Sequence, residues 1–353
     1  MNEKTRAELQ KHVEEIAKIL HAEAEPNELK SLEGIEKSVR NLTQEYVMPE
    51  IGNFFIKEET QTEAGRSRSL TSILGNLKIT TQQAKKLDLK KGNRWSPYVE
   101  KCCLLISANE SYQRAEEDLE VLTGIKVSRS TQQRMVQSKD WEAPELTDPI
   151  EEMSLDGGMV RLRTPLGCPC EWKEYKALNV HERVKIAYFK DNEGLLSWVK
   201  AQPLAAPFAC LGDGHDGVWN IFAQIGTAQE REEILDWYHL MENAHKIRGT
   251  PQQKATICHL LWTGQIPQTF DYLRTQKGLR ARDFWQYLKK HRTRLINYQA
   301  RQADGGSIGS GAVESLVKQI ALRVKLPGAQ WSRDNVPKLL KHRCAYLNGA
   351  FSL

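Results

Sequence analysis

The sequence predicts a mixed α/β protein in which a mostly helical region precedes a sheet-containing domain. Three observations predict this class. Strand-like runs separated by turn residues occupy residues 151–212, helical periodicity dominates from Glu230 onward, and helical patterns also fill residues 3–24 and 28–47. Strands followed by helices indicate an α/β or α+β domain that carries a helical insertion.

Two prolines in the stretch "WEAPELTDPIEE" (141–152) mark a boundary between the two halves. Before it, residues 1–65 are predicted to form a helical N-terminal region with a linker. The polar run 57–72 reads as that linker or as a mobile segment, and "ILGNLKITTQ" (73–82) as a short strand. Residues 66–148 are predicted to be a DNA-binding region.

The clearest local pattern before the boundary is a pair of helices around a glycine. A helix from about Ser111 to Leu122, a turn at Gly124 and a second helix that starts at Ser128 or Ser130 fit a helix-turn-helix over residues 111–137. An ordinary helical hairpin fits the same pattern. In a helix-turn-helix the second helix enters a DNA groove. The side chains that we expect it to expose are Arg129, Gln132, Gln133 and Arg134.

The distribution of charge separates the two ends of the chain. The net charge of the 353 residues is +5, yet residues 1–60 hold 8 Lys or Arg against 13 Asp or Glu. Residues 274–301 hold 9 against one, and residues 318–343 hold 7 against one. An acidic front and a basic back indicate that a polyanion binds the C-terminal half.

The basic stretch 274–301 is interleaved with Phe284, Trp285, Tyr287 and Tyr298. These rings either stack on nucleic-acid bases or form the apolar face of a solvated basic helix. The predicted DNA contacts here are Arg280, Arg282, Lys289, Lys290, Arg292 and Arg294.

Composition excludes some classes. The apolar runs are too short to span a membrane, and the N-terminus lacks the apolar stretch of a signal peptide, so we expect an intracellular protein. The seven cysteines lack paired CxxC spacing, which argues against a zinc site, and a disulfide framework is not expected.

Two aspartates follow strand-like runs beside glycine. Asp156 follows Met153 and Leu155 in "MSLDGG", and Asp213 ends the apolar run 208–211 in "FACLGDGHDG". Taken alone, each fits a hairpin turn. Together they indicate carboxylates held at strand ends, where glycine lets a phosphate approach. Asp216 is a rival to Asp213, which we prefer because it directly ends the strand.

A third acid lies on a helix after a Gly-Ser loop. In "DGGSIGSGAVESLVKQIALRVK" the buried stripe contains Val313 and Ile320, and Glu314 lies beside that stripe on the face of Lys318 and Lys325, as a site on a phosphate backbone would. Two strand aspartates and a helix glutamate are hard oxygen ligands for Mg²⁺ or Mn²⁺. Two such ions activate a water or a 3′-hydroxyl toward a phosphodiester.

The contexts "SLDGG", "LGDGHDGVWN" and "GSGAVES" resemble those of bacterial insertion-sequence transposases of the DDE class, nearest to the ISKra-like group. The stretches "EWKEYKALNV", "ILDWYHLMENAHKI" and "GAQWSRDNVPKLLKHRCAYLNGAF" are similar as well, and the resemblance covers roughly residues 108–351. It implies an RNase H-like catalytic domain in three parts: residues 149–229, a helical and basic insertion over 230–305, and a catalytic helix with C-terminal helices over 306–353.

The resemblance further implies that Asp156, Asp213 and Glu314 hold two Mg²⁺ ions. The family's Asp/Cys-x-x-His motif falls on Asp236 and His239, and His239 would reach the scissile phosphate or orient a ligand. Without the family, His239 also fits a hydrogen-bonded core histidine. One departure is that residues 1–101 lack the zinc-binding cysteine pairs that many such transposases carry.

The function expected from this resemblance is cleavage and strand transfer at the inverted repeats of a transposable element. Expected partners are double-stranded DNA and further copies of the chain, in a bacterial cytoplasm. Two alternatives stay open: a non-catalytic DNA-binding regulator derived from a transposase, and another RNase H-like nuclease.

Overall fold

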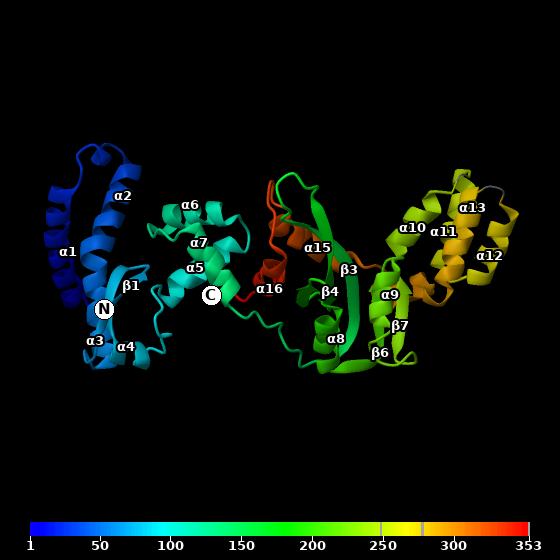
Figure 1. Cartoon of the computed structure of the whole chain (residues 1–353), viewed down its shortest axis with the longest axis horizontal. Helices are drawn as coiled ribbons and strands as arrows, with labels where there is room; N and C mark the ends of the chain where they lie inside the picture. The colour runs from blue at the N-terminus through cyan, green and yellow to red at the C-terminus, as the bar shows by residue number, and fades with distance from the viewer. Residues whose placement is uncertain (248, 277–278, 352–353) are drawn as a thin grey trace. The chain divides into compact units, whose positions relative to one another are not determined.

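The computed structural model describes residues 1–247, 249–276 and 279–351, in two compact units of residues 1–135 and 136–353 (Figure 1). The division falls inside helix α7. Among the described residues, no helix has both the length and the apolar character that a membrane crossing requires. The predicted boundary at residues 148–149 lies in the extended segment that follows α7.

The first unit is mostly helical, as the periodicity of its sequence predicts. Its elements are α1 (Glu3–Glu23), η1 (Glu28–Lys30), α2 (Leu32–Leu42), the π-helical η2 (Thr43–Val47), α3 (Met48–Thr60), β1 (Ser67–Ser72), β2 (Gly75–Thr80), α4 (Thr81–Lys86), α5 (Pro97–Ser107), α6 (Tyr112–Thr123) and α7 (Arg129–Ser138).

The polar run expected to be a linker contains a strand at its end. Strand β1 pairs antiparallel with β2, and Leu70 and Ile79 from the two strands are buried together. Leu70, the one apolar residue of β1, was too little to predict the strand, because the hairpin is stabilised by packing against α3 and α4 rather than by its own sequence.

The helix pair around Gly124 forms at the predicted place. Gly124 ends α6 in a left-handed conformation (φ 74°), and α7 begins directly after Ser128. Leu119 and Val127 are buried, whereas Leu122 is exposed. Gln44 of η2 fixes the end of α6, since its amide donates to the carbonyls of Thr123 and Ile73. The pair is helical, and its identity as a DNA-binding helix-turn-helix stays a prediction.

The second unit is built on a five-stranded mixed sheet with the order β5-β4-β3-β6-β7. β4 is antiparallel to β3 and β5, and β6 and β7 run parallel to β3. Its elements are β3 (Ile150–Leu162), β4 (Glu171–Val180), β5 (Val184–Tyr188), α8 (Asn192–Ala201), β6 (Leu204–Gly212), α9 (Asp216–Phe222), β7 (Arg231–Leu235), α10 (Trp237–His245), α11 (Pro251–Trp262), α12 (Ile266–Thr275), α13 (Leu279–Lys290), η3 (Arg292–Arg294), α14 (Tyr298–Ala303), α15 (Gly311–Val324), η4 (Arg333–Asn335) and α16 (Val336–Leu347).

Helices cover both faces of this sheet (Figure 1). Met153 and Leu155 of β3 join the core that includes α8, α9 and α10, whereas Val160 and Leu162 join the core under α15 and α16. Successive residues of a strand point to opposite faces. Gly158 and Val160 come two and four residues after Asp156, so all three lie on the same face of β3. That is the face that α15 covers.

Two strands differ from the expectation. β3 does not end at Asp156 but continues to Leu162, so that Asp156 lies within the strand, opposite Ala177 of β4. β7 falls where helix was expected, because its sequence "REEIL" carries three charges. Two of them, Arg231 and Glu233, form an ion pair of 2.9 Å and are largely shielded from water, which lets a charged segment serve as an edge strand.

The segment between β7 and α15 is helical, as predicted for 230–305, in the form of α10 to α14. Lys277 and Gly278 of the basic stretch lie outside the described residues.

We predict that Gly158→Ala destabilises the sheet. A Cβ atom at position 158 would lie 2.2 Å from Cζ of Tyr175, a buried ring that packs under α15. The free energy of unfolding should fall by about 1–3 kcal/mol, measured by denaturant unfolding.

Gly311→Ala is the matched control, because nothing lies within 4 Å of a Cβ atom there. At this first position of α15 alanine should stabilise by up to about 1 kcal/mol. Equal effects of the two substitutions would contradict the packing described.

Candidate active site

Three aspartates lie side by side across the parallel strands. Leu155 of β3 is paired with Gly212 of β6, and Gly212 is paired with Leu235 of β7. The residue that follows each of these positions is an aspartate: Asp156, Asp213 and Asp236, called here the aspartate row. The backbone N–H of Asp236 donates to the Gly212 carbonyl at 2.9 Å and so extends the ladder to this level.

The aspartates of the row differ in exposure. Asp236 is buried, whereas Asp156 and Asp213 are half-buried and remain accessible. Asp213 follows the end of β6, as predicted, and its Oδ1 accepts a hydrogen bond of 2.8 Å from the backbone N–H of His215. The row thus contains one buried and two accessible carboxylates.

Asp236 organises the elements around the row. Its Oδ1 caps α10 by accepting from the His239 backbone N–H at 2.9 Å, and its Oδ2 accepts from both the N–H and the hydroxyl of Ser310 at 2.5 Å. Burial alone would raise the pKa of Asp236, but the His239 side chain, together with the hydrogen bonds from Ser310 and from the His239 N–H, outweighs it and lowers the pKa to about 2. Asp236 is therefore ionised, and it holds the loop that leads into α15.

His239 places a positive charge beside the row. Its Nδ1 lies 3.5 Å from Oδ1 of Asp236, and its side chain is 37% exposed. The close pairing with the Asp236 carboxylate raises the pKa of His239 to about 9 against the opposing effect of burial, and the charge of Asp213 adds to the rise. The imidazole is consequently protonated at neutral pH. This environment differs from that of a neutral core histidine.

The positive charges near Asp156 only partly offset its burial and the negative charge of Asp213. Burial raises its pKa, and the nearby Asp213 raises it further. The N–H of Gly157, at 2.6 Å from Oδ1, lowers the pKa, as do the charges of His239 and Lys176. A cation bound between Asp156 and Asp213 would relieve the repulsion of the two carboxylates.

Glu314 lies on the face of the sheet that Asp156 faces but is not part of the row. Helix α15 is fixed there by Asn179, whose amide donates to the Ala312 carbonyl at 3.3 Å, and by Ser310 one turn before Glu314. The Glu314 carboxylate is about half exposed and pairs with Lys318 at 2.7 Å. The structure therefore assembles Asp156, Asp213 and His239 and leaves Glu314 paired with its own helix.

The accessible carboxylates have the donor chemistry that Mg²⁺ needs. Among residues 1–247, 249–276 and 279–351, no three His, Cys, Asp or Glu side chains already converge as a metal group. Mg²⁺ does not require such a cage, because proteins usually hold it through one or two carboxylates together with water and substrate phosphates. The partly uncompensated negative charge of Asp156 and the neighbouring Asp213 fits this mode of binding.

Asp216, the rival of Asp213, lies outside the row. It is the first residue of α9 and forms an ion pair of 2.6 Å with Lys290 of α13. That pairing lowers the pKa of Asp216 and joins the helical segment after β7 to the end of β6. His215 caps α9, since its Nδ1 accepts from the Gly217 N–H at 3.2 Å.

The glycines next to Asp213 serve packing. They were expected to leave room for a phosphate. Instead, a Cβ atom at Gly214 would lie 2.9 Å from the hydroxyl oxygen of Tyr287, and one at Gly212 would lie 2.6 Å from a methyl group of Val218. Both glycines thus let a protein side chain approach the backbone closely.

Two side chains lie near the row that the sequence did not place there. Tyr287, which was expected either to stack on bases or to lie on the apolar face of its helix, comes from α13, and its pKa is raised first by burial and then by the charges of Asp213 and Asp236. Lys176 of β4 is buried, pairs with Glu174 at 2.8 Å, and lowers the pKa of Asp156. Lys176 is placed near the row by its pairing with Gly157 across β3 and β4, which the sequence alone does not show.

Ten of the twelve predicted DNA contacts are exposed. The first of two corrections falls in α7. Gln132 is 1% exposed, and its amide donates to the Val127 carbonyl at 2.9 Å, so the expectation that it is exposed is wrong. It stabilises the turn between α6 and α7. The exposed members of the predicted set are Arg129, Gln133, Arg134, Arg280, Arg282, Lys289, Lys290, Arg292, Lys318 and Lys325.

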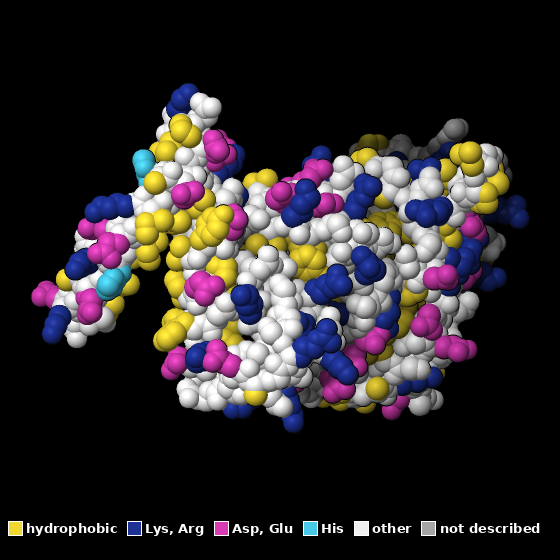
Figure 2. Space-filling view, turned by 60° about the vertical axis from the view of Figure 1, so that its left-hand side comes forward, with side chains coloured by type: hydrophobic (Ala, Val, Ile, Leu, Met, Phe, Trp, Pro, Cys, Tyr) yellow, Lys and Arg dark blue, Asp and Glu magenta, His cyan; other side chains and the backbone are white. Residues whose placement is uncertain are grey.

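Arg294 is the second correction. Its guanidinium pairs with Glu233 at 2.7 Å and lies 4.2 Å from the centre of the Trp219 ring. It therefore ties η3 to β7 and α9 and does not present a free cation. Elsewhere, lysines and arginines are interspersed with acidic side chains over the face shown in Figure 2.

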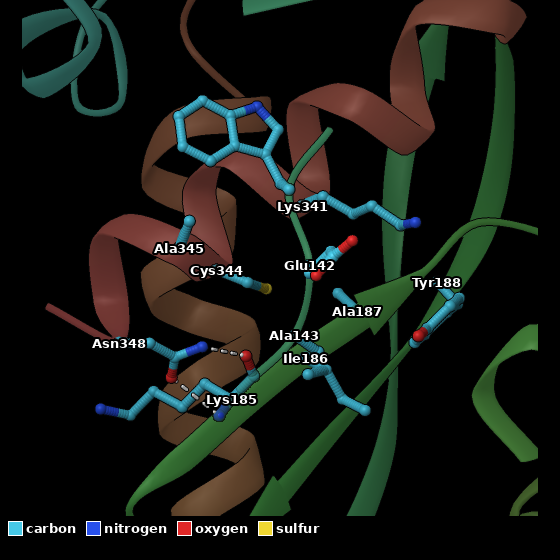
Figure 3. A pocket seen from close by; sticks show the side chains of 11 residues that line it. Glu142, Ala143, Lys185, Ile186, Ala187, Tyr188, Lys341, Cys344, Ala345 and Asn348 are labelled. Carbon is cyan, nitrogen blue, oxygen red and sulfur yellow. Dashed lines mark hydrogen bonds between the residues drawn. The ribbon is translucent and has the colours of Figure 1, made fainter. Parts of the chain in front are cut away.

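A small cavity lies at the opposite edge of the sheet, between β5, α16 and the segment after α7 (Figure 3). Its volume is about 20 Å³, room for about one water molecule. Two hydrogen bonds between Asn348 and the backbone of Lys185, at 2.8 and 2.9 Å, close one end of it. The cavity is too small for a cofactor and is separated from the aspartate row by β4.

Comparison of the chain with family models gives no match, and comparison with curated proteins gives none either.

We predict that Asp236→Asn lowers the pKa of His239 from about 9 toward its ordinary value of 6.5, measured by NMR titration of the histidine ring. In the native protein the ion pair stabilises the fold fully below pH 6.5, and this stabilisation is lost as the pH rises toward 9. Asp271→Asn, which changes an exposed aspartate of α12, is the control and should leave the titration unchanged. An unaltered His239 pKa in Asp236→Asn would contradict the pairing.

Proposed function

We propose that this chain is a DDE-type transposase with an RNase H-like catalytic domain. It would bind the terminal inverted repeats of an insertion sequence, cleave the DNA at their ends and carry out strand transfer. The observation that carries the proposal is the aspartate row: two accessible carboxylates side by side on parallel strands, beside a protonated histidine and below a helix that carries Glu314.

The topology of the sheet supports the catalytic fold proposed. Counted along the second unit, its five strands lie in the order 3-2-1-4-5, with only the second strand antiparallel to the others. That is the strand order expected of an RNase H-like domain. Asp156 on the first strand and Asp213 after the fourth strand then occupy adjacent central positions.

Asp156, Asp213 and Glu314 would hold two Mg²⁺ ions, which Mn²⁺ could replace. When bound, such ions activate the attacking oxygen and stabilise the leaving oxygen of a phosphodiester. The pair between Glu314 and Lys318 is no obstacle, because an exposed i, i+4 ion pair contributes only about 0.3–0.5 kcal/mol. Glu314 can therefore turn toward the aspartates at little cost.

His239 would bind the phosphate that is cut. Asp236 keeps the imidazole charged by pairing with its Nδ1, which leaves the other ring nitrogen as a donor. A charged donor preorganised next to Asp213 stabilises negative charge on a phosphate oxygen. Asp236 itself is a positioning residue, because its buried carboxylate is already fully engaged.

The exposed basic side chains of α7, α13 and α15 would contact the phosphates of double-stranded DNA. Two DNA ends must be held together for strand transfer, so we propose that the chain acts as a dimer or a higher oligomer on DNA. Its place would be the bacterial cytoplasm, in association with the nucleoid.

We predict that Asp156→Asn, Asp213→Asn and Glu314→Gln each reduce cleavage of element-end DNA with Mg²⁺ by at least about 1,000-fold, since each removes a charge that holds a metal ion. The assay is cleavage of a labelled inverted-repeat duplex.

Asp216→Asn is the matched control for this series. It removes an aspartate three residues from Asp213 that pairs with Lys290 instead of belonging to the row, so cleavage should change by only a few-fold. Cleavage that survives the triple substitution would refute the catalytic assignment. End binding without any cleavage by the unaltered protein would favour the regulator, and cleavage without preference for the ends would favour another nuclease.

We predict that His239→Gln reduces the cleavage rate by about 10²- to 10³-fold with little change in the affinity for end DNA, because it removes one charged donor at the cut phosphate. His245→Gln, at the exposed end of the same helix, should leave the rate unchanged. Equal rates for the two variants would exclude His239 from the site.

A further inference from the structure

Helices α1 and α2 each carry a heptad stripe. The apolar residues of α1 recur at alternating steps of four and three, and those of α2 and η2 at steps of three and four. This spacing of 3.5 residues is the pattern of helices that pack along one another as a coiled coil. The stripes, called here the hairpin seam, consist of Leu9, Val13, Ile16 and Leu20 in α1 and Leu32, Ile35, Val39, Leu42 and Tyr46 in α2 and η2.

The hairpin seam is not buried within the chain. No residue of α1, all of which the structure describes, is buried. Val13 is 53% exposed, Val39 is 54% exposed, and Leu32 is 72% exposed. A helix whose apolar face lacks a partner gains little stability from packing, and packing supplies most of the stability of helices in proteins.

An open groove runs between the two stripes. Its volume is about 420 Å³, and its lining is almost entirely apolar, with Val13, Ile16, Ile35 and Val39 among its walls. Figure 2 shows hydrophobic side chains gathered along the helical segment at the left that carries the histidines of α1. The two stripes therefore face a common space that side chains from another helix pair would fill.

The exposed area matches what a second copy would bury. Seven apolar side chains of α1 and α2 are between 38% and 72% exposed: Leu9, Val13, Ile16, Ile19, Leu32, Ile35 and Val39. They amount to roughly 600 Å² per copy, and so to about 1,200 Å² for two copies, which is the lower end of a specific interface. This area is at the upper end of the largest apolar patch on a typical monomer, and such patches often mark interaction sites.

The charges on α1 favour an antiparallel second copy. Residues 3–11 hold three Lys or Arg against two Glu, whereas residues 12–25 hold one Lys against four Glu. In an antiparallel pair of α1 helices, each weakly basic first half would lie along a partner's acidic second half. A parallel pair would place the two acidic halves together.

We propose that the α1–α2 hairpins of two copies of this chain pack against each other through the hairpin seam and form an intermolecular four-helix bundle, with the two α1 helices antiparallel. Burial of the seam is the source of its stability. The dimer forms without DNA and does not depend on the aspartate row. A test of the dimer is therefore independent of any test of the proposed catalysis.

The test is the mass of the full chain in solution, measured by sedimentation at micromolar concentration without DNA. The unaltered protein should have twice the 40.3 kDa mass of one chain. Val13→Asp and Val39→Asp should each weaken the dimer by at least ~100-fold, because each buries two uncompensated charges. Ala7→Asp is the matched control: it adds the same charge to the exposed opposite face of α1 and should leave the dimer intact.

Circular dichroism separates loss of the interface from loss of the fold, and the milder Ile16→Ala and Val39→Ala provide the same comparison if an aspartate variant loses its helices. These alanine variants should weaken the dimer while helicity at high protein concentration is retained. A monomeric unaltered protein would overturn the proposal. So would a dimer that persists in Val13→Asp and Val39→Asp, or one that Ala7→Asp dissociates equally.

Discussion

The register of three parallel strands is the constraint on which the candidate site depends. Because Leu155, Gly212 and Leu235 are paired across β3, β6 and β7, the next residue of each strand falls at the same level. A shift of one residue in either pairing would turn one aspartate to the other face of the sheet. Buried side chains on both faces resist that shift, so the fold itself enforces the closeness of three like charges.

Electrostatics explains how the fold tolerates this closeness. Asp236 is neutralised in place by Ser310, the first turn of α10 and the His239 ring, while Lys176 approaches the row from the neighbouring strand. The two accessible aspartates are compensated only in part. A cation bound at this edge of the sheet would offset the remaining deficit of positive charge at Asp156 and Asp213. The hydrogen bonds of Ser310 also couple the row to α15, and so to Glu314.

Much of this could be predicted from the sequence, and the failures have physical causes. Apolar runs next to glycine predict the strands around Asp156 and Asp213. The sequence of β7 does not predict a strand, because Glu233 pairs with Arg231 and Arg294 only in the folded chain. Gln132 and Arg294 looked like DNA contacts because both are polar residues in basic stretches. Their partners, the Val127 carbonyl and Glu233, become visible only in three dimensions.

We propose that Asp156 and Asp213 together bind a divalent metal ion. The most direct test is a crystal structure of the chain with Mn²⁺, located by its anomalous scattering. If both aspartates bind the ion, an anomalous peak lies within about 2.0–2.3 Å of a carboxylate oxygen of each. A peak that contacts neither aspartate, or full anomalous occupancy elsewhere with none at the row, would contradict it.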